Sequence, residues 1–197
     1  MPRPDVRDER IPQILDAAVA VFSRDGIDGA NMSAIAEGAG VSKATIYHYF
    51  SSKEEVIGAL VKRILSLDRT AVDELRNGSG SVRERLIGYA DRLSATIQEN
   101  RELFLVTGEI QARAARVPSL KWLASSFYRE YLAVVESVIE QAVEREEVER
   151  DIDVRGTAIG YVAVIEGTMI VGQHLEGDPR ESMIASVSAY LNGIIPT

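Results

Sequence analysis

The most informative segment of the chain reads Gly40-Val41-Ser42-Lys43-Ala44-Thr45-Ile46-Tyr47-His48-Tyr49-Phe50-Ser51-Ser52-Lys53-Glu54-Glu55. A glycine turn leads into a serine that can cap a very short helix, because a serine oxygen accepts free N–H groups at a helix start. That helix carries one lysine, hydroxyls and aromatic rings where a solvated helix would carry glutamates and lysines. A second serine-capped helix follows. This order is typical of the reading half of a helix-turn-helix, so the segment predicts an interaction with DNA.

Composition narrows the class of protein. The 197 residues are 46% hydrophobic and 26% charged, which is ordinary for a globular domain with a substantial core. The absence of cysteine excludes disulfides, thiolate nucleophiles and zinc fingers. The two histidines, His48 and His174, are too few for a histidine-rich metal site, so we expect neither a metal nor a cofactor.

The sequence also predicts a cytoplasmic protein. The polar N-terminus has no apolar segment after it, so we expect no signal peptide. The most apolar stretch, residues 157–172, is expected to be too short to span a bilayer and contains Glu166.

Net charge argues against broad affinity for nucleic acids. The chain carries a formal charge of −8, whereas DNA-binding proteins usually present a basic surface. Residues 40–53, however, contain two lysines and no carboxylate. We therefore expect one small positive surface on an acidic body, with weak nonspecific DNA binding.

The spacing of apolar residues predicts an all-α fold of about nine helices and no strand. We expect two domains, a helix-turn-helix domain at residues 1–55 and a larger domain at 56–197. The expected helices span 11–26, 31–38, 43–50, 52–75, 81–97, 100–117, 120–143, 154–174 and 178–194. Their starts are marked by capping residues, namely Asn31, Ser42, Asp178 and the capping boxes Ser52 with Glu55 and Ser81 with Glu84.

The first turn of the helix at 43–50 carries the side chains best suited to bases. Lys43 can reach guanine acceptors or a phosphate, and Thr45 offers a methyl group to thymine or a hydroxyl to a base or phosphate. Ala44 is small enough for a close backbone approach. Lys53 begins the next helix, where backbone N–H groups already favour an anion.

The rest of this helix divides between DNA contact and core. Tyr47, His48 and Tyr49 supply donors suited to phosphates, although Tyr49 fits core packing equally well. Ile46 and Phe50 lie one turn apart and are expected to be buried.

Residues 11–55 resemble the DNA-binding domain of TetR-family transcriptional regulators. The matching features cover about a quarter of the chain: Ile14-Leu15-Asp16-Ala17-Ala18 with Phe22 and Gly26, Met32-Ser33-Ala34-Ile35-Ala36, and the whole segment from Gly40 to Glu55.

The resemblance implies a dimer of all-α subunits, with three N-terminal helices for DNA and about six for effector binding and dimerisation. It further implies a repressor that binds a pseudo-palindromic operator and is released by a small, mostly apolar effector. The DNA-facing residues it implies are Ser33, Ser42, Lys43, Ala44, Thr45, Tyr47, His48 and Tyr49, with Lys53 on a phosphate. Asn31 and Ser33 depart from the family pattern, which often has Thr or Ser followed by Arg.

A row of small residues marks one face of the helix at 154–174: Gly156, Gly160, Ala163 and Gly167. Such a row lowers helix propensity and suits the close approach of another helix, either within the subunit or from a partner. The resemblance places this helix and the last one in a four-helix dimer interface, which adds Met183, Val187 and Leu191 as candidates.

The resemblance also assigns several helices to an effector pocket. Their candidate side chains are Tyr89, Phe104, Glu109, Trp122, Phe127, Tyr128 and Tyr131. Glu109 fits two roles, a ligand contact or a structural acid with a polar partner. The helix at 52–75 would link the pocket mechanically to the DNA-binding domain.

Two other functions are weaker interpretations of the sequence. A helical-bundle enzyme lacks support, because the sequence has no catalytic carboxylate pair, nucleophile elbow or phosphate-binding glycine loop. A helix-turn-helix regulator controlled by a protein partner remains an alternative to control by a small ligand.

Overall fold

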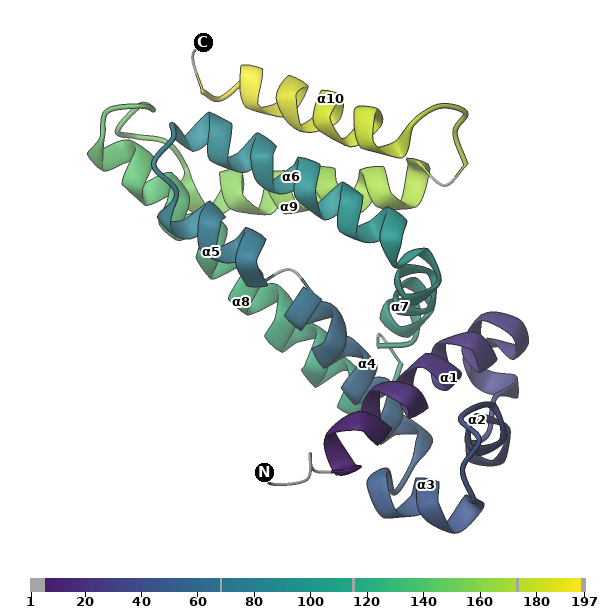
Figure 1. The fold of residues 1–197 in the computed structure, drawn as a ribbon. Helices are drawn as coiled ribbons and strands as arrows, with labels where there is room; N and C mark the ends of the chain where they lie inside the picture. The colour runs from purple at the N-terminus through teal and green to yellow at the C-terminus, as the bar shows by residue number, and fades with distance from the viewer. Residues whose placement is uncertain (1–5, 68, 115, 173, 196–197) are drawn as a thin grey trace, which may run out of the picture. The chain divides into compact units, whose positions relative to one another are not determined.

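The structure is a computed structural model that describes residues 6–67, 69–114, 116–172 and 174–195. Every regular element within these ranges is a helix, as Figure 1 shows, and this confirms the all-α prediction. The ten helices of the described chain are α1 (Val6–Gly29), α2 (Met32–Gly38), α3 (Lys43–Tyr49), α4 (Lys53–Leu67), α5 (Arg69–Asn77), α6 (Val82–Glu99), α7 (Arg101–Ala114), α8 (Pro118–Glu144), α9 (Val154–Gly172) and α10 (Pro179–Asn192).

The helix expected at residues 52–75 is described in two parts. Helix α4 ends at Leu67 and α5 begins at Arg69, while residue 68 lies outside the described residues. The apolar spacing expected for this segment continues into α5, where Ala71 and Leu75 are buried.

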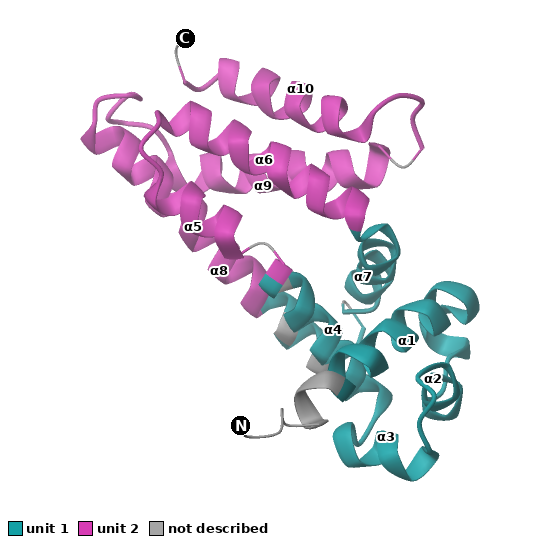
Figure 2. Cartoon of the chain, in the orientation of Figure 1, with its two compact units in different colours: residues 1–66, 100–125 teal, residues 67–99, 126–197 magenta. Residues whose placement is uncertain are grey.

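The chain forms two compact units (Figure 2). Unit 1 contains residues 1–66 and 100–125, and unit 2 contains residues 67–99 and 126–197. This division differs from the expected boundary after residue 55, because α4 and α7 belong to the same unit as α1–α3.

The core of unit 1 is built around α1. Its buried stripe includes Ile14, Ala18 and Phe22, and it lies in one hydrophobic cluster with Ile35 of α2 and Ile46 of α3. Buried residues of α4 and α7 complete the cluster, namely Val56, Ile57, Leu60, Leu103, Val106 and Ile110. The three N-terminal helices therefore rest on α4 and α7.

Capping residues start the helices largely as predicted. The Asn31 side chain accepts hydrogen bonds from the N–H groups of Ser33 and Ala34, at 3.1 and 3.0 Å. Ser52 accepts the N–H of Glu55, but the Glu55 carboxylate accepts from Ser51 and not from Ser52. These Ser51 bonds hold the pKa of Glu55 below its usual value.

Unit 2 packs α10 against both α6 and α9. Tyr161 of α9 is fully buried, and its hydroxyl donates to the carbonyl of Leu86 in α6 at 2.7 Å. The predicted capping box of Ser81 and Glu84 is complete in both directions, and Asp178 caps α10.

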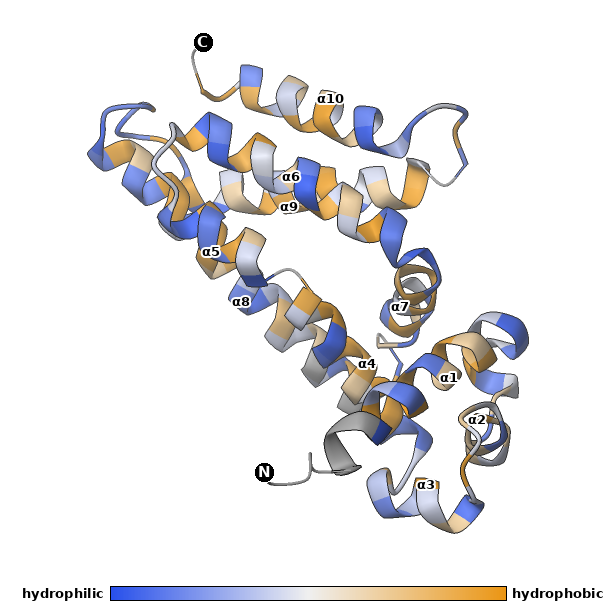
Figure 3. Ribbon diagram, in the orientation of Figure 1, coloured by the Kyte–Doolittle hydropathy of each residue, from blue (hydrophilic) through white to orange (hydrophobic). Residues whose placement is uncertain are grey.

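Helix α9 is longer than the apolar stretch at residues 157–172 that the sequence predicted to be too short to span a bilayer. With 19 residues and a mean hydropathy of 1.3 in its most apolar window, it is the one helix among the described residues long and apolar enough to cross a membrane. Apolar residues recur on every turn (Figure 3). This is weak support for a membrane span, because Ala158, Tyr161, Val162 and Ile165 are buried inside unit 2.

Candidate nucleic-acid interface

The turn before α3 and the capping of α3 orient this short helix. Gly40 has a φ of 62°, a left-handed conformation that glycine adopts without a side-chain clash. The Ser42 oxygen accepts the N–H of Thr45 at 3.0 Å, as predicted, and lies 2.7 Å from the Thr45 hydroxyl. Ile46 is fully buried and Phe50 is 6% exposed, so both anchor α3 to the core as expected.

The opposite side of α3 faces solvent. Tyr47 is 47% exposed, whereas a tyrosine that belonged to the hydrophobic core would be covered. Thr45 and Tyr49 are half-buried, and the Tyr49 ring meets that of His48 edge to face at 5.4 Å. The other predicted DNA-facing residues of this segment are exposed: Ser42, Lys43, Ala44 and His48.

Ser33, the DNA contact predicted in α2, is also exposed. It lies in the first turn of α2, where its N–H is bound by the Asn31 cap. Its side chain is thus accessible, and its contact with DNA stays a prediction.

Lys53 has partners that the sequence did not indicate. Its ammonium donates to the backbone carbonyls of Ile27 at 2.6 Å and Ala30 at 2.9 Å, with Asp28 at 3.4 Å. An ammonium has three N–H donors, so these carbonyls can occupy all of them in the DNA-free protein, and a contact of Lys53 with a phosphate stays a prediction.

Four of the candidate effector residues gather in unit 2. The rings of Phe127 and Tyr128 are 5.0 Å apart, those of Phe127 and Tyr131 are 6.0 Å apart, and Tyr131 lies 5.7 Å from Tyr89. Tyr89 and Tyr131 are buried, whereas Phe127 and Tyr128 are half-buried. The four rings form one aromatic cluster from α6 and α8.

The other three effector candidates belong to unit 1. Phe104 is half-buried and Trp122 is 69% exposed. The Glu109 carboxylate accepts the N–H of Ile27 at 2.9 Å, which gives this acid the polar partner that the structural alternative required.

Three predicted dimer contacts are wrong. Met183, Val187 and Leu191 are between 0 and 3% exposed within a single subunit, because this face of α10 packs on α6 and α9. They are core residues and cannot reach a partner. The sequence pattern marked an apolar face of α10 but not which neighbour covers it.

The small residues of α9 have different surroundings. Gly160 lies directly beneath the Tyr190 ring, whose hydroxyl donates to the Thr157 carbonyl at 2.8 Å, so packing within the subunit explains this glycine. Gly156 lies beside Asp153, which accepts its N–H at 2.9 Å. Gly167 instead has open space where a Cβ would lie.

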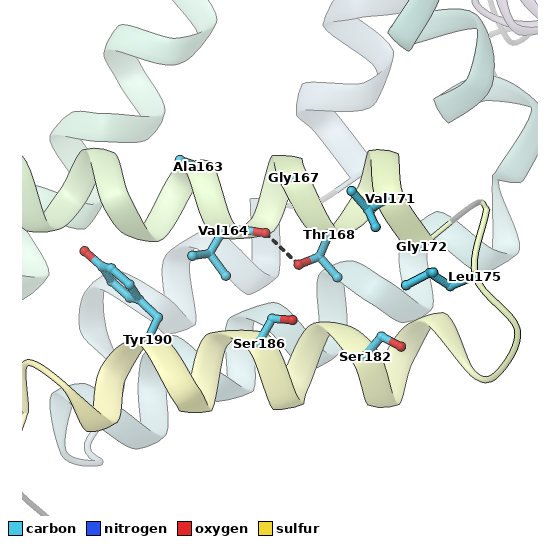
Figure 4. Close-up of a pocket in the computed structure, with 10 residues that line it drawn as sticks. All are labelled: Ala163, Val164, Gly167, Thr168, Val171, Gly172, Leu175, Ser182, Ser186 and Tyr190. Carbon is cyan, nitrogen blue, oxygen red and sulfur yellow. Dashed lines mark hydrogen bonds between the residues drawn. The ribbon is translucent and has the colours of Figure 1, made fainter.

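Gly167 and Ala163 line an open groove between α9 and α10 with a volume of about 550 Å³. Figure 4 shows the α9 and α10 side chains on either side of it. Its remaining lining residues are Val164, Thr168, Val171, Gly172, Leu175, Ser182, Ser186 and Tyr190.

Glu166 lies beside the aromatic cluster, and sequence reasoning used it only against a membrane span. Burial in apolar surroundings raises the pKa of its carboxyl, and a hydrogen bond with Tyr128 opposes this shift. The bond joins Glu166 of α9 to the aromatic cluster. The sequence signal that could have pointed to Glu166 is a single acidic residue in a largely apolar helix.

Two protein-family models match the chain, one near its N-terminus and one over its C-terminal half. Residues 14–60 match the model of bacterial regulatory proteins of the tetR family, and residues 82–196 match that of the BetI-type transcriptional repressor C-terminal domain. The chain belongs to the TetR family. It is a helix-turn-helix, DNA-binding transcriptional regulator.

Relatives of this TetR-family chain match it over nearly its full length. The nicotine-responsive transcriptional repressor HdnoR of Paenarthrobacter nicotinovorans is 26% identical over 94% of this chain and 96% of its own. The regulator BetI of Rhizobium meliloti is 27% identical over 98% and 92%. The fold matches the crystal structure of Bacillus subtilis FadR in complex with stearoyl-CoA, with a TM-score of 0.82, 22% identity and coverage of 93% and 98%.

Family membership also indicates which kinds of partner such regulators bind. TetR-family regulators bind DNA operators and small ligands, typically as dimers, and these relatives are regulators and not enzymes.

Proposed function

We propose that this regulator is a dimeric repressor that binds a pseudo-palindromic operator in the cytoplasm and is released by a small, mostly apolar effector. The observation that carries the proposal is that one side of α3 is buried in the core while its other sides are exposed to solvent. Its inner side, with Ile46, is fully buried, while Lys43, Tyr47 and His48 on other sides are exposed and free of nearby carboxylates on the same helix.

We take α3 as the recognition helix, because its side chains have chemistry suited to a major groove. Lys43 in its first turn would meet guanine acceptors, and Tyr47 and His48 would contact phosphates. The Thr45 hydroxyl already lies 2.7 Å from that of Ser42, which favours use of the Thr45 methyl group on a thymine.

A pseudo-palindrome requires two recognition helices about 34–36 Å apart, and hence a second subunit. We assign the second subunit to the groove between α9 and α10. Val171 and Leu175 line it and are 52% and 58% exposed, and Ala163 and Gly167 leave room for a helix. These groups are apolar and uncovered, as an isologous contact needs.

The aromatic cluster of Tyr89, Phe127, Tyr128 and Tyr131 is our candidate effector site. Such rings bind the apolar body of a ligand, and Glu166 adds one polar group. The ligands of similar proteins support this choice, because one relative responds to nicotine and the FadR structure contains stearoyl-CoA. A coupling free energy of about 1–3 kcal/mol would change operator affinity by about 5–150-fold.

The decisive experiment is selection of genomic fragments by the purified protein, followed by gel-shift titration of the fragment recovered. We expect K43A/Y47A to abolish specific binding while the protein remains dimeric in sedimentation. As a control, K121A, which removes an exposed lysine from α8, should leave binding unchanged. Unchanged binding by K43A/Y47A would contradict the proposed role of α3.

A further inference from the structure

The end of α1 contains a kink whose backbone groups need partners from elsewhere. Gly26 has a φ of 70° and a ψ of 163°, which interrupts the regular helix. The segment from Ile27 to Ala30 follows and leads directly into Asn31, the cap of α2. An interrupted helix leaves N–H and C=O groups without their usual helical partners, so side chains must bind them.

Lys53 binds this segment from α4. Its three backbone acceptors lie within residues 27–30, the closest being the carbonyl of Ile27 at 2.6 Å. A cation at the carbonyl end of a helix is also favoured by the helix dipole. The lysine therefore holds the connection between α1 and α2 to the start of α4.

Glu109 and Arg113 bind the same segment from α7. Glu109 accepts the N–H of Ile27 at 2.9 Å, and one turn later Arg113 forms an ion pair with Asp28. Ile27 is only 1% exposed. Both its N–H and its C=O are thus held by side chains, one from α7 and the other from α4.

We propose that Lys53 and Glu109 form a clasp on Ile27 that positions α2 and α3 for operator binding. In this proposal Glu109 is a positioning residue and not an effector contact, and Lys53 acts on the protein backbone and not on a phosphate. The proposal rests on the proposed function only in taking operator affinity as its readout.

The clasp joins α4 and α7, which lie at two of the three places where the chain passes between the units, the third being within α8. Helix α4 is followed by α5 of unit 2, and α7 is preceded by α6 of unit 2. A change in α4 therefore reaches the α1–α2 connection through Lys53, and a change in α7 reaches it through Glu109 and Arg113. Loss of the Glu109 acceptor leaves a buried N–H unpaired, which favours rearrangement of the connection.

The test compares E109L with E109Q. Glutamine keeps an acceptor oxygen for the Ile27 N–H, whereas leucine removes it. We expect E109L to bind operator about tenfold more weakly, and E109Q to stay within about twofold of the wild type. The matched control is E102L, which removes an exposed carboxylate from the same helix. Equal operator affinities for E109L and E102L would overturn the clasp.

Lys53 is tested through salt dependence. If Lys53 bound a phosphate, K53M would lower the slope of log affinity against log salt by about one unit. The clasp predicts weaker binding with an unchanged slope, because the same number of counterions is released on binding. A slope lower by about one unit would therefore refute our role for Lys53.

Amide hydrogen exchange separates failure of the clasp from failure of the proposed function. In the free protein we expect the Ile27 amide to exchange about tenfold faster in E109L than in E109Q, with core amides of α1 unchanged. If no duplex binds the wild type, the proposed function fails, and this exchange difference still supports the clasp. Equal Ile27 exchange in the two variants would overturn it.

Discussion

At the residue scale, the clearest energetic conflict is Glu166, the one carboxylate of α9. Its folded-state pKa is raised above the ordinary value of 4.5, chiefly because burial penalises the charged form. The folded protein therefore binds this proton more tightly than the unfolded chain does. Stability consequently falls as the pH rises from about 4.5 through the folded-state pKa, and the penalty is complete above it.

We predict that E166Q is more stable than the wild type at about pH 8, and that the difference shrinks towards about pH 4. Glutamine keeps the shape and a hydrogen-bonding group for Tyr128 but carries no charge. Thermal unfolding of both proteins over this pH range measures the effect. A constant difference across the range would show that ionisation of Glu166 is not its cause.

At the element scale, the close contact of α9 with α10 depends on Gly160. An added Cβ would overlap the Tyr190 ring, so G160A should destabilise the subunit by about 1–2 kcal/mol, since overpacking outweighs the gain in helix propensity. Denaturant unfolding tests this value. In a Y190A background the same substitution should be neutral or stabilising, because the overlapping ring is gone.

The matched control for this prediction is G88A in α6, where nothing lies within 4 Å of an added Cβ. It should stabilise the helix by up to about 1 kcal/mol. Destabilisation by both substitutions would point to a general intolerance of alanine and not to the Tyr190 contact.

At the scale of the whole molecule, the proposed function requires a second subunit, which we place in the groove between α9 and α10. We predict that V171E places a charge in this apolar contact, yields monomers in sedimentation and lowers operator affinity by about tenfold or more. Leu105 is similarly apolar and 43% exposed but lies outside the groove, so L105E should remain dimeric. A dimeric V171E would place the interface elsewhere.

Local chemistry made the helices and their starts predictable. Asn31, Ser42, Ser81 and Asp178 cap helices within a few residues of their own position, so the sequence alone determined them. The buried Ile46 and the exposed Lys43 likewise follow from the periodicity of one short helix. The helix-turn-helix and the all-α class rest on such short-range signals.

Contacts between distant segments were decided only by the tertiary structure. Lys53 and Glu109 meet Ile27 across 26 and 82 residues, and no local pattern encodes such a meeting. Periodicity likewise marked Val187 as apolar without showing that its own subunit buries it. Sequence periodicity specifies which face of a helix is apolar, whereas three-dimensional packing selects the neighbour that covers it.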